Sequence, residues 1–90
     1  MVTISIEETM EDYLTVIGNT ALIVEETQTY QIVTDLHYRL VYDTAYLKVT
    51  QNGNILTVTT RMKTGKTSLD FYNGDDLVLA YPLEINSLWV

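Results

Sequence analysis

The chain has 90 residues, 47% of them apolar, which is the size and composition of one folded domain, residues 1–90, with a modest core. It contains no cysteine, which excludes disulfides and thiolate chemistry and favours a reducing, cytoplasmic location. No apolar run approaches the roughly 18 residues of a membrane span, and the amino terminus lacks the basic region of a signal peptide.

The formal net charge of −7 is unevenly distributed along the chain. All charged residues in the segment 1–38 are acidic, whereas acids and bases are equal in number in the segment 39–90. The acids of the first segment are Glu7, Glu8, Glu11, Asp12, Glu25, Glu26 and Asp35. Because binding to nucleic acid depends on neutralising phosphates, this balance disfavours nucleic acid as a partner. It favours a basic protein as the partner, or serves solubility alone.

The pattern of residues 6–17 predicts a helix. Ser5 and Glu8 fit a capping box, in which the carboxylate reaches back to the N-cap residue. Apolar residues then recur at three- and four-residue spacing, namely Ile6, Met10, Tyr13, Leu14 and Ile17. Gly18 fits the left-handed position that follows a helix. The β-branched run at 15–17 leaves a strand as the alternative.

Strands are predicted for most of the remaining chain. Residues 20–24 form a short apolar run, and the alternation along residues 30–42 predicts one bent strand or two in tandem. Asn52-Gly53 is typical of a type I′ hairpin turn. That turn would place Val49 opposite Leu56, with the apolar residues of both strands on one face.

Gly65-Lys66-Thr67 has the last three letters of a phosphate-binding P-loop. A P-loop also needs a glycine where this chain has Thr60, and a helix immediately afterwards. Residues 67–72 alternate like a strand instead. The sequence therefore predicts that residues 63–66 are a hairpin loop joining two paired strands.

A second Asn-Gly pair, at residues 73–74, predicts the next turn. The strand after it is apolar on both faces, with Leu77, Leu79 and Tyr81 on the second face. We expect the N-terminal helix, a curled sheet or a second copy of the chain to cover them. Pro82 is expected to interrupt the ladder, and the residues after it to form a last strand or a short helix.

Three groups of side chains could carry chemistry. Asp35, His37 and Arg39 alternate along one predicted strand, so the imidazole could act as a general base, but the polar side of a half-buried strand is the preferred interpretation. The acids at 7–12 and 75–76 lack the spaced oxygen ligands of a calcium loop, so no metal and no cofactor is expected. The third group could stack and hold single-stranded nucleic acid, against which the net charge argues. It comprises Tyr46, Lys48, Arg61 and Tyr72, with Lys63 and Lys66 nearby.

The predicted fold is α+β, with one N-terminal helix packed on a twisted antiparallel β-meander of about five to seven strands, or on a partial barrel. We expect a non-enzymatic protein-binding module, an acidic inhibitor or regulator that engages a basic, nucleic-acid-binding protein. The anti-CRISPR and anti-restriction inhibitors of phages have this style of size and charge. The alternatives are a homo-oligomeric structural or virion-type accessory protein, such as a homodimer, and a small enzyme using His37.

The predicted sites follow from these hypotheses. The expected partner-binding residues are Glu8, Glu11, Asp12, Glu25 and Glu26. The expected oligomer interface comprises Leu77, Leu79, Tyr81 and Trp89. No catalytic residue is predicted.

Overall fold

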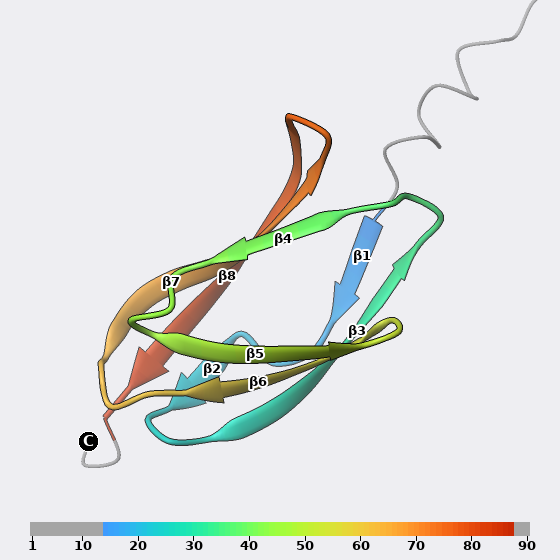
Figure 1. Cartoon of the computed structure of the whole chain (residues 1–90). Helices are drawn as coiled ribbons and strands as arrows, with labels where there is room; N and C mark the ends of the chain where they lie inside the picture. Colours follow the sequence, from blue (N-terminus) through green and yellow to red (C-terminus); the bar gives the residue numbers. More distant parts are fainter. Residues whose placement is uncertain (1–13, 88–90) are drawn as a thin grey trace, which may run out of the picture.

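The computed structural model describes residues 14–87, which contain strands and connecting turns (Figure 1). The strands are β1 (Leu14–Ile17), β2 (Ala21–Ile23), β3 (Thr27–Thr34), β4 (Arg39–Tyr42), β5 (Leu47–Asn52), β6 (Ile55–Thr60), β7 (Gly65–Asn73) and β8 (Asp76–Asn86). No helix occurs between residues 14 and 87. The predicted α+β class is therefore wrong for the part of the chain that the structure describes.

The eight strands form two four-stranded sheets. The first sheet has the order β1-β3-β6-β5, and the second has the order β2-β8-β7-β4. All neighbours pair antiparallel except β2 and β8, which are parallel. This is the strand order of an immunoglobulin-like β-sandwich whose first strand is divided between the sheets as β1 and β2. A sandwich of two sheets thus replaces the predicted single meander or partial barrel.

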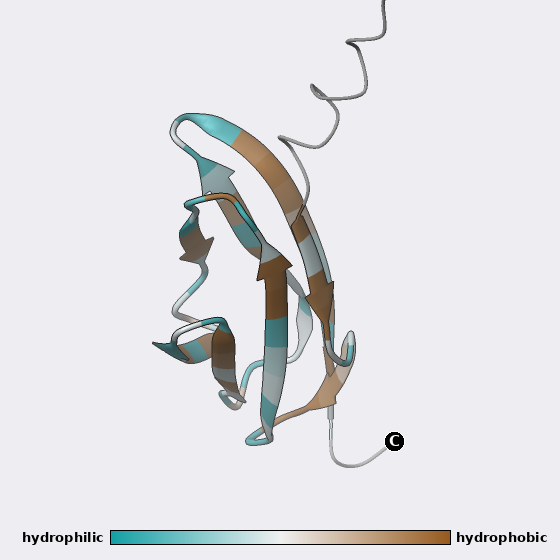
Figure 2. Ribbon diagram, turned by 90° about the vertical axis from the view of Figure 1, so that its right-hand side faces the viewer, coloured by the Kyte–Doolittle hydropathy of each residue, from teal (hydrophilic) through white to brown (hydrophobic). Residues whose placement is uncertain are grey.

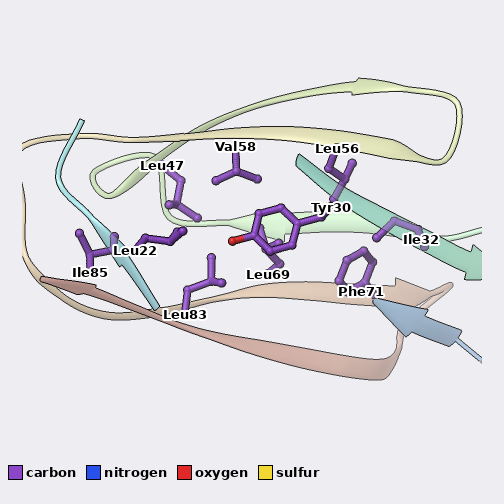
Figure 3. Close-up of a cluster of buried hydrophobic side chains, with 10 residues drawn as sticks. All are labelled: Leu22, Tyr30, Ile32, Leu47, Leu56, Val58, Leu69, Phe71, Leu83 and Ile85. Atoms are coloured by element: carbon purple, nitrogen blue, oxygen red, sulfur yellow. The ribbon is translucent and has the colours of Figure 1, made fainter. Parts of the chain in front are cut away.

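The core lies between the two sheets, and each sheet supplies half of it (Figure 3). The first sheet contributes Tyr30, Ile32, Leu47, Leu56 and Val58. The second contributes Leu22, Leu69, Phe71, Leu83 and Ile85. Because side chains on a strand point alternately to opposite faces, the strands turn apolar residues inwards and most of the polar residues outwards. Figure 2 shows hydrophilic and hydrophobic residues following one another along the strands.

The last four residues of the predicted helix form strand β1, which pairs with β3. Their sequence, Leu14-Thr15-Val16-Ile17, ends in three consecutive residues that are branched at Cβ, and such residues favour strands. Leu14 and Val16 pack against the core, while Ile17 lies on the outer face. Leu14 and Ile17 also fit the predicted helical stripe, and pairing with β3 decides in favour of the strand. Residues 6–13 of the predicted helix lie outside the described part.

Gly18 sits where the chain leaves the first sheet for the second. A Cβ atom at this position would overlap the ring of Tyr30, so only glycine fits there. Two tyrosine hydroxyls fasten the crossing: Tyr30 donates to the Asn19 carbonyl at 2.6 Å and Tyr81 to the Gly18 carbonyl at 2.7 Å. The role predicted for Gly18, the end of a helix, is replaced by a close approach to an aromatic ring.

The β5–β6 hairpin confirms the predicted faces and corrects the predicted register. Val49 pairs with Val58 and Gln51 pairs with Leu56, so the partner of each residue lies two positions further along β6 than the type I′ turn predicts. The reason is that Gly53 and Asn54 are the two central residues of the turn. Gly53 has φ 61° and Asn54 does not have a positive φ, which is the pattern of a type II′ turn.

Residues 61–64 are a crossover between sheets and not the predicted hairpin loop. Strand β6 belongs to the first sheet and β7 to the second, and the two do not pair. Arg61, the residue after β6, still lies beside the first sheet, because its N–H donates at 2.9 Å to the carbonyl of Tyr46, the residue before β5. The chain then enters β7 at Gly65, where a P-loop would instead continue into a helix.

Strand β8 differs from the prediction in two ways. The pairing of β7 with β8 has a bulge between Phe71 and Tyr72, where Val78 has no partner. Leu79 pairs with Phe71 and faces the core. Leu77 pairs with Tyr72 and faces out. The ladder also runs through Pro82. The Glu84 N–H points to the β2 side of β8 and donates to the Thr20 carbonyl. The nitrogen of Pro82, two residues earlier, points to the same side, where β2 does not reach it. Pro82 therefore removes no hydrogen bond from the ladder with β7.

Candidate binding surface

Three turns meet at one end of the sandwich, which we call the turn end. They are the β3–β4 connection at residues 35–38, the β5–β6 turn at 53–54 and the β7–β8 turn at 73–76. The β7–β8 hairpin reaches beyond the rest of the sandwich (Figure 1). The opposite end, which we call the far end, carries residues 24–26, 43–46 and 61–64. In variable domains of antibodies, the connections that correspond to β3–β4 and β7–β8 are two of the three binding loops.

The β7–β8 hairpin is braced by Arg39, the first residue of β4. Its guanidinium carbon lies 4.8 Å from the centre of the Tyr72 ring, and its terminal nitrogen donates to the Gly74 carbonyl at 3.2 Å. The side-chain amide of Asn73 donates in the other direction, to the carbonyl of His37 at 3.0 Å. These contacts connect the hairpin to the β3–β4 turn through residues about 35 positions apart in the sequence.

Tyr38 connects the third turn to the other two. Its ring packs edge-on against Phe71, with 5.3 Å between the centroids, and its hydroxyl accepts a hydrogen bond from Gln51 at 2.9 Å. The same Gln51 amide donates to the Gly53 carbonyl in the β5–β6 turn at 3.1 Å. Burial raises the pKa of Tyr38 above its ordinary value. The three turns are thus held in fixed relative positions, and a surface organised in advance loses less entropy on binding.

The turn end presents carboxylates and an exposed apolar side chain. Asp35 is exposed in the β3–β4 connection, and Asp75 and Asp76 are exposed in the β7–β8 turn, where Leu77 follows them with 53% of its surface exposed. Figure 2 shows the hydrophilic tip of the β7–β8 hairpin followed by the apolar stretch of β8. Arg39 is the basic residue of this end, and its guanidinium is already engaged with the ring and the carbonyl of the hairpin.

The predicted Asp35-His37-Arg39 face is not assembled. Residues 35–37 belong to the β3–β4 connection, and β4 begins only at Arg39. The carbonyl of His37 accepts from Asn73, while its imidazole makes no hydrogen bond within residues 14–87. In the same part of the chain, no three His, Asp or Glu side chains come close enough together to hold a metal ion.

Of the predicted partner-binding residues, Glu8, Glu11 and Asp12 lie outside the described part. Glu25 and Glu26 lie at the far end, in the β2–β3 turn. Both carboxylate oxygens of Glu26 accept hydrogen bonds, one from the Ile23 N–H at 2.9 Å and the other from the Gln28 amide at 2.7 Å. Glu26 therefore shapes this turn. Glu25 lines a depression together with Lys48 and Arg61, so the base-free surface expected around these two glutamates does not form.

Of the predicted oligomer interface, only Leu77 is exposed among the three residues that the structure describes. Leu79 and Tyr81 pack against the core, so the first sheet of the same chain covers them. Trp89 lies outside the described part. The expected basic and aromatic group is also divided, because Tyr46, Lys48 and Arg61 adjoin the first sheet and Tyr72 belongs to the second.

Sequence reasoning missed the roles of Arg39, Gln51 and Asn73 as braces of the turn end. Each acts on a residue that is distant in the sequence, and no local pattern marks such a contact. The signals that were available are the two Asn-Gly pairs, at residues 52–53 and 73–74, which correctly mark two of the three turns.

The comparisons with known proteins bear on the fold. No known protein family and no curated protein matches the sequence. The structure is similar to that of the adhesin InvE of Yersinia pseudotuberculosis, with a TM-score of 0.54 and 14% sequence identity. The similarity covers 82% of this chain and 26% of the adhesin chain. At this identity the likeness concerns the sandwich alone. Within residues 14–87 no helix has the length and apolar character needed to cross a bilayer.

Proposed function

We propose that this chain is a non-enzymatic protein-binding module that recognises its partner through the turn end. The observation that carries the proposal is the braced β7–β8 hairpin, which projects from the sandwich and is fixed by Arg39 and Asn73 to the β3–β4 turn. A rigid projecting hairpin with an exposed Leu77 supplies an apolar contact point surrounded by polar groups, which is the usual anatomy of a protein-binding site.

The charge of the turn end favours a basic partner. Three exposed carboxylates lie there, on Asp35, Asp75 and Asp76, against the one guanidinium of Arg39, so the acids outnumber the lysines and arginines of this end. Strand β1 also begins at this end, and the acids Glu7, Glu8, Glu11 and Asp12 precede it in the sequence. The basic partner expected from composition is therefore assigned to the turn end in place of a helix face. The narrower role of an anti-defence inhibitor stays a prediction.

A selection from a random peptide library displayed on phage tests this proposal. The immobilised full chain should enrich basic peptides that also carry apolar residues, and the binding should weaken as salt rises because charges exposed to solvent are screened. Asp75→Lys/Asp76→Lys should abolish the enrichment. Glu25→Lys/Glu84→Lys is the matched control, because it changes the net charge equally at exposed positions away from the turn end.

The outcomes separate a site from a general charge effect. Enrichment that survives Asp75→Lys/Asp76→Lys, with the fold verified by circular dichroism, would show that the turn end is not the binding surface. Equal loss in the control would show that net charge alone attracts the peptides. Leu77→Ala should lower the affinity without changing its salt dependence, since it removes the apolar contact and no charge.

A second candidate function is that of one module in a longer surface protein. The chain enters the sandwich at the turn end, at Leu14, and β8 ends at Asn86 at the far end, an arrangement that permits copies or other modules to follow one another in line (Figure 1). The chain spans only about a quarter of the adhesin that shares its fold. Two copies joined in tandem should each unfold with the stability of a single copy if this candidate is correct.

A further inference from the structure

The far end carries a depression of about 300 Å³ with basic side chains on its rim. Its lining residues are Glu25, Lys48, Thr59, Thr60, Arg61 and Met62. Lys63 follows directly in the chain. We call these seven residues the basic groove. Three bases and one acid occur in it, although the chain as a whole is strongly acidic.

The positive charges of the basic groove are available to a ligand. Lys48 forms no ion pair within residues 14–87, and Arg61 uses its Nε to donate to the Thr44 carbonyl at 2.8 Å, which directs the guanidinium without neutralising it. The ammonium of Lys63 lies 4.6 Å from the centre of the Tyr46 ring. The two other acids of this end have oxygens that accept N–H groups of the chain itself, Glu26 from Ile23 and Gln28, and Asp43 from Ala45 at 2.9 Å.

The basic groove also has an apolar component. Met62 has 69% of its surface exposed, the largest exposed fraction among the exposed large apolar residues of the described chain. A flexible thioether between two cations fits a ligand that is itself both acidic and apolar. A purely polar anion would leave this contact unused.

This chain contains a segment of that chemistry. The stretch Ile6-Glu7-Glu8-Thr9-Met10-Glu11-Asp12 has four acids, no base and two large apolar residues. We propose that the protein associates head to tail, with the acidic segment 6–12 of one copy bound in the basic groove of the next. The proposal rests on the proposed function, because it identifies the basic partner of the turn end as a second copy of this chain.

Distances along the sandwich favour a second copy over the segment's own chain. The segment precedes Leu14, which pairs with Thr34 at the turn end, whereas the basic groove lies beside Thr59, which pairs with Thr27. Seven residue steps of β3 separate those levels, about 23 Å at the rise of a strand. Glu7 is also seven steps from Leu14, about 25 Å when fully extended. Within one copy, the segment would have to turn back along the sandwich and be fully extended, and even then only Glu7 would reach the groove.

Between two copies the same groups meet without this constraint. When the turn end of one copy faces the far end of the next, the segment starts at the junction and all four acids lie within reach. Such a contact joins two different surfaces, so it repeats from copy to copy and builds open chains or rings. Opposite charges would select the orientation, and the contact should weaken at high salt.

Sedimentation velocity of the full chain over a wide concentration range tests this inference. The wild-type mass should rise with concentration at low salt and return to that of a monomer at high salt. Lys48→Glu/Lys63→Glu should stay monomeric, and so should Glu8→Lys/Glu11→Lys/Asp12→Lys. Lys66→Glu is the control for the groove variant, because it lies outside the groove and should associate like the wild type.

An equimolar mixture of the two charge-reversed variants provides the decisive measurement. Each reversed surface then has an oppositely charged counterpart on the other variant, so the mixture should associate although neither variant does so alone. A wild type that stays monomeric at the highest concentration in low salt, or a mixture that stays monomeric, would overturn the inference. The phage-display selection repeated with Lys48→Glu/Lys63→Glu separates the two proposals. If this variant still enriches basic peptides, the proposed function stands whatever the sedimentation result. If it no longer enriches them, both the proposed function and the head-to-tail association are contradicted.

Discussion

Replacing Gly18 by alanine tests the crossing between the two sheets. The new Cβ atom would overlap the ring of Tyr30, a side chain that is 1% exposed and surrounded by the core. Forcing an extra methyl group into a packed interior costs about 1–3 kcal/mol. If the ring moves to relieve the overlap, its hydrogen bond to the Asn19 carbonyl is also lost, at about 1 kcal/mol. We therefore expect Gly18→Ala to lower the free energy of unfolding by about 2–4 kcal/mol.

Thermal and urea unfolding measure this change directly. For a domain of this size, such a loss corresponds to a fall in Tm of roughly 10–25 °C. Gly53→Ala and Gly74→Ala are the controls: both glycines have a left-handed φ, 61° and 63°, but no atom lies within 4 Å of an added Cβ. They should cost about 1–2 kcal/mol for the conformation alone. If Gly18→Ala is no more harmful than these controls, the close approach to Tyr30 does not constrain the crossing.

Three further predictions concern single side chains. Thr60→Val should lower the free energy of unfolding in urea by about 1–3 kcal/mol. The buried Thr60 hydroxyl donates to the Ile23 carbonyl at 2.6 Å and accepts from the Glu26 N–H at 2.8 Å, and valine can do neither. Thr60→Ser keeps the hydroxyl and should keep most of the stability. Burial raises the pKa of Tyr30 from 10.0 to about 12. The neutral hydroxyl therefore stabilises the fold below pH 10, and this contribution should be lost as the pH rises towards 12. In Tyr30→Phe, which has no hydroxyl to titrate, stability should fall less over the same pH range. Neither ATP nor GTP should raise the Tm, and Lys66→Ala should leave it nearly unchanged; a clear nucleotide-dependent shift would contradict the absence of a phosphate site at this crossover.

Alternation along the sequence predicted the faces of the strands but not the sheet to which each strand belongs. The inward rows of β5 and β6 were predictable because a period of two fixes which residues share a face, and the observed shift of the pairing by two residues leaves those faces unchanged. The connection at 61–64 was not, since a hairpin and a crossover can have the same short and mostly polar sequence. The choice depends on which strands pair across the whole chain. Strand β6 pairs with β5 on one side and with the distant β3 on the other, so no edge of β6 is left for β7.

The N-terminal region and β8 show two other limits. Leu14 and Ile17 fit the helical stripe, while the β-branched run at 15–17 fits a strand, and the outcome is set by pairing with β3, a contact between distant segments. In β8, one extra residue at Val78 shifts the alternation, so Leu79 faces the core while Leu77 stays outside. A bulge of this kind has no dependable local signature. The same applies to the turn end, whose location requires the complete topology.

The division of the first strand has a mechanical consequence. Leu14 lies at one end of the sandwich and Asn86 at the other, so tension applied to the two ends would pull β1 and β8 along their own axes in opposite directions. The parallel pair of β2 and β8, with the Glu84 N–H bonded to Thr20 and the Val24 N–H to Asn86, would be loaded in shear. Its hydrogen bonds must then rupture together, whereas a strand peeled from its end loses them one at a time. The sandwich should therefore withstand a higher force in single-molecule stretching from its two ends than when it is pulled across the β5–β6 hairpin.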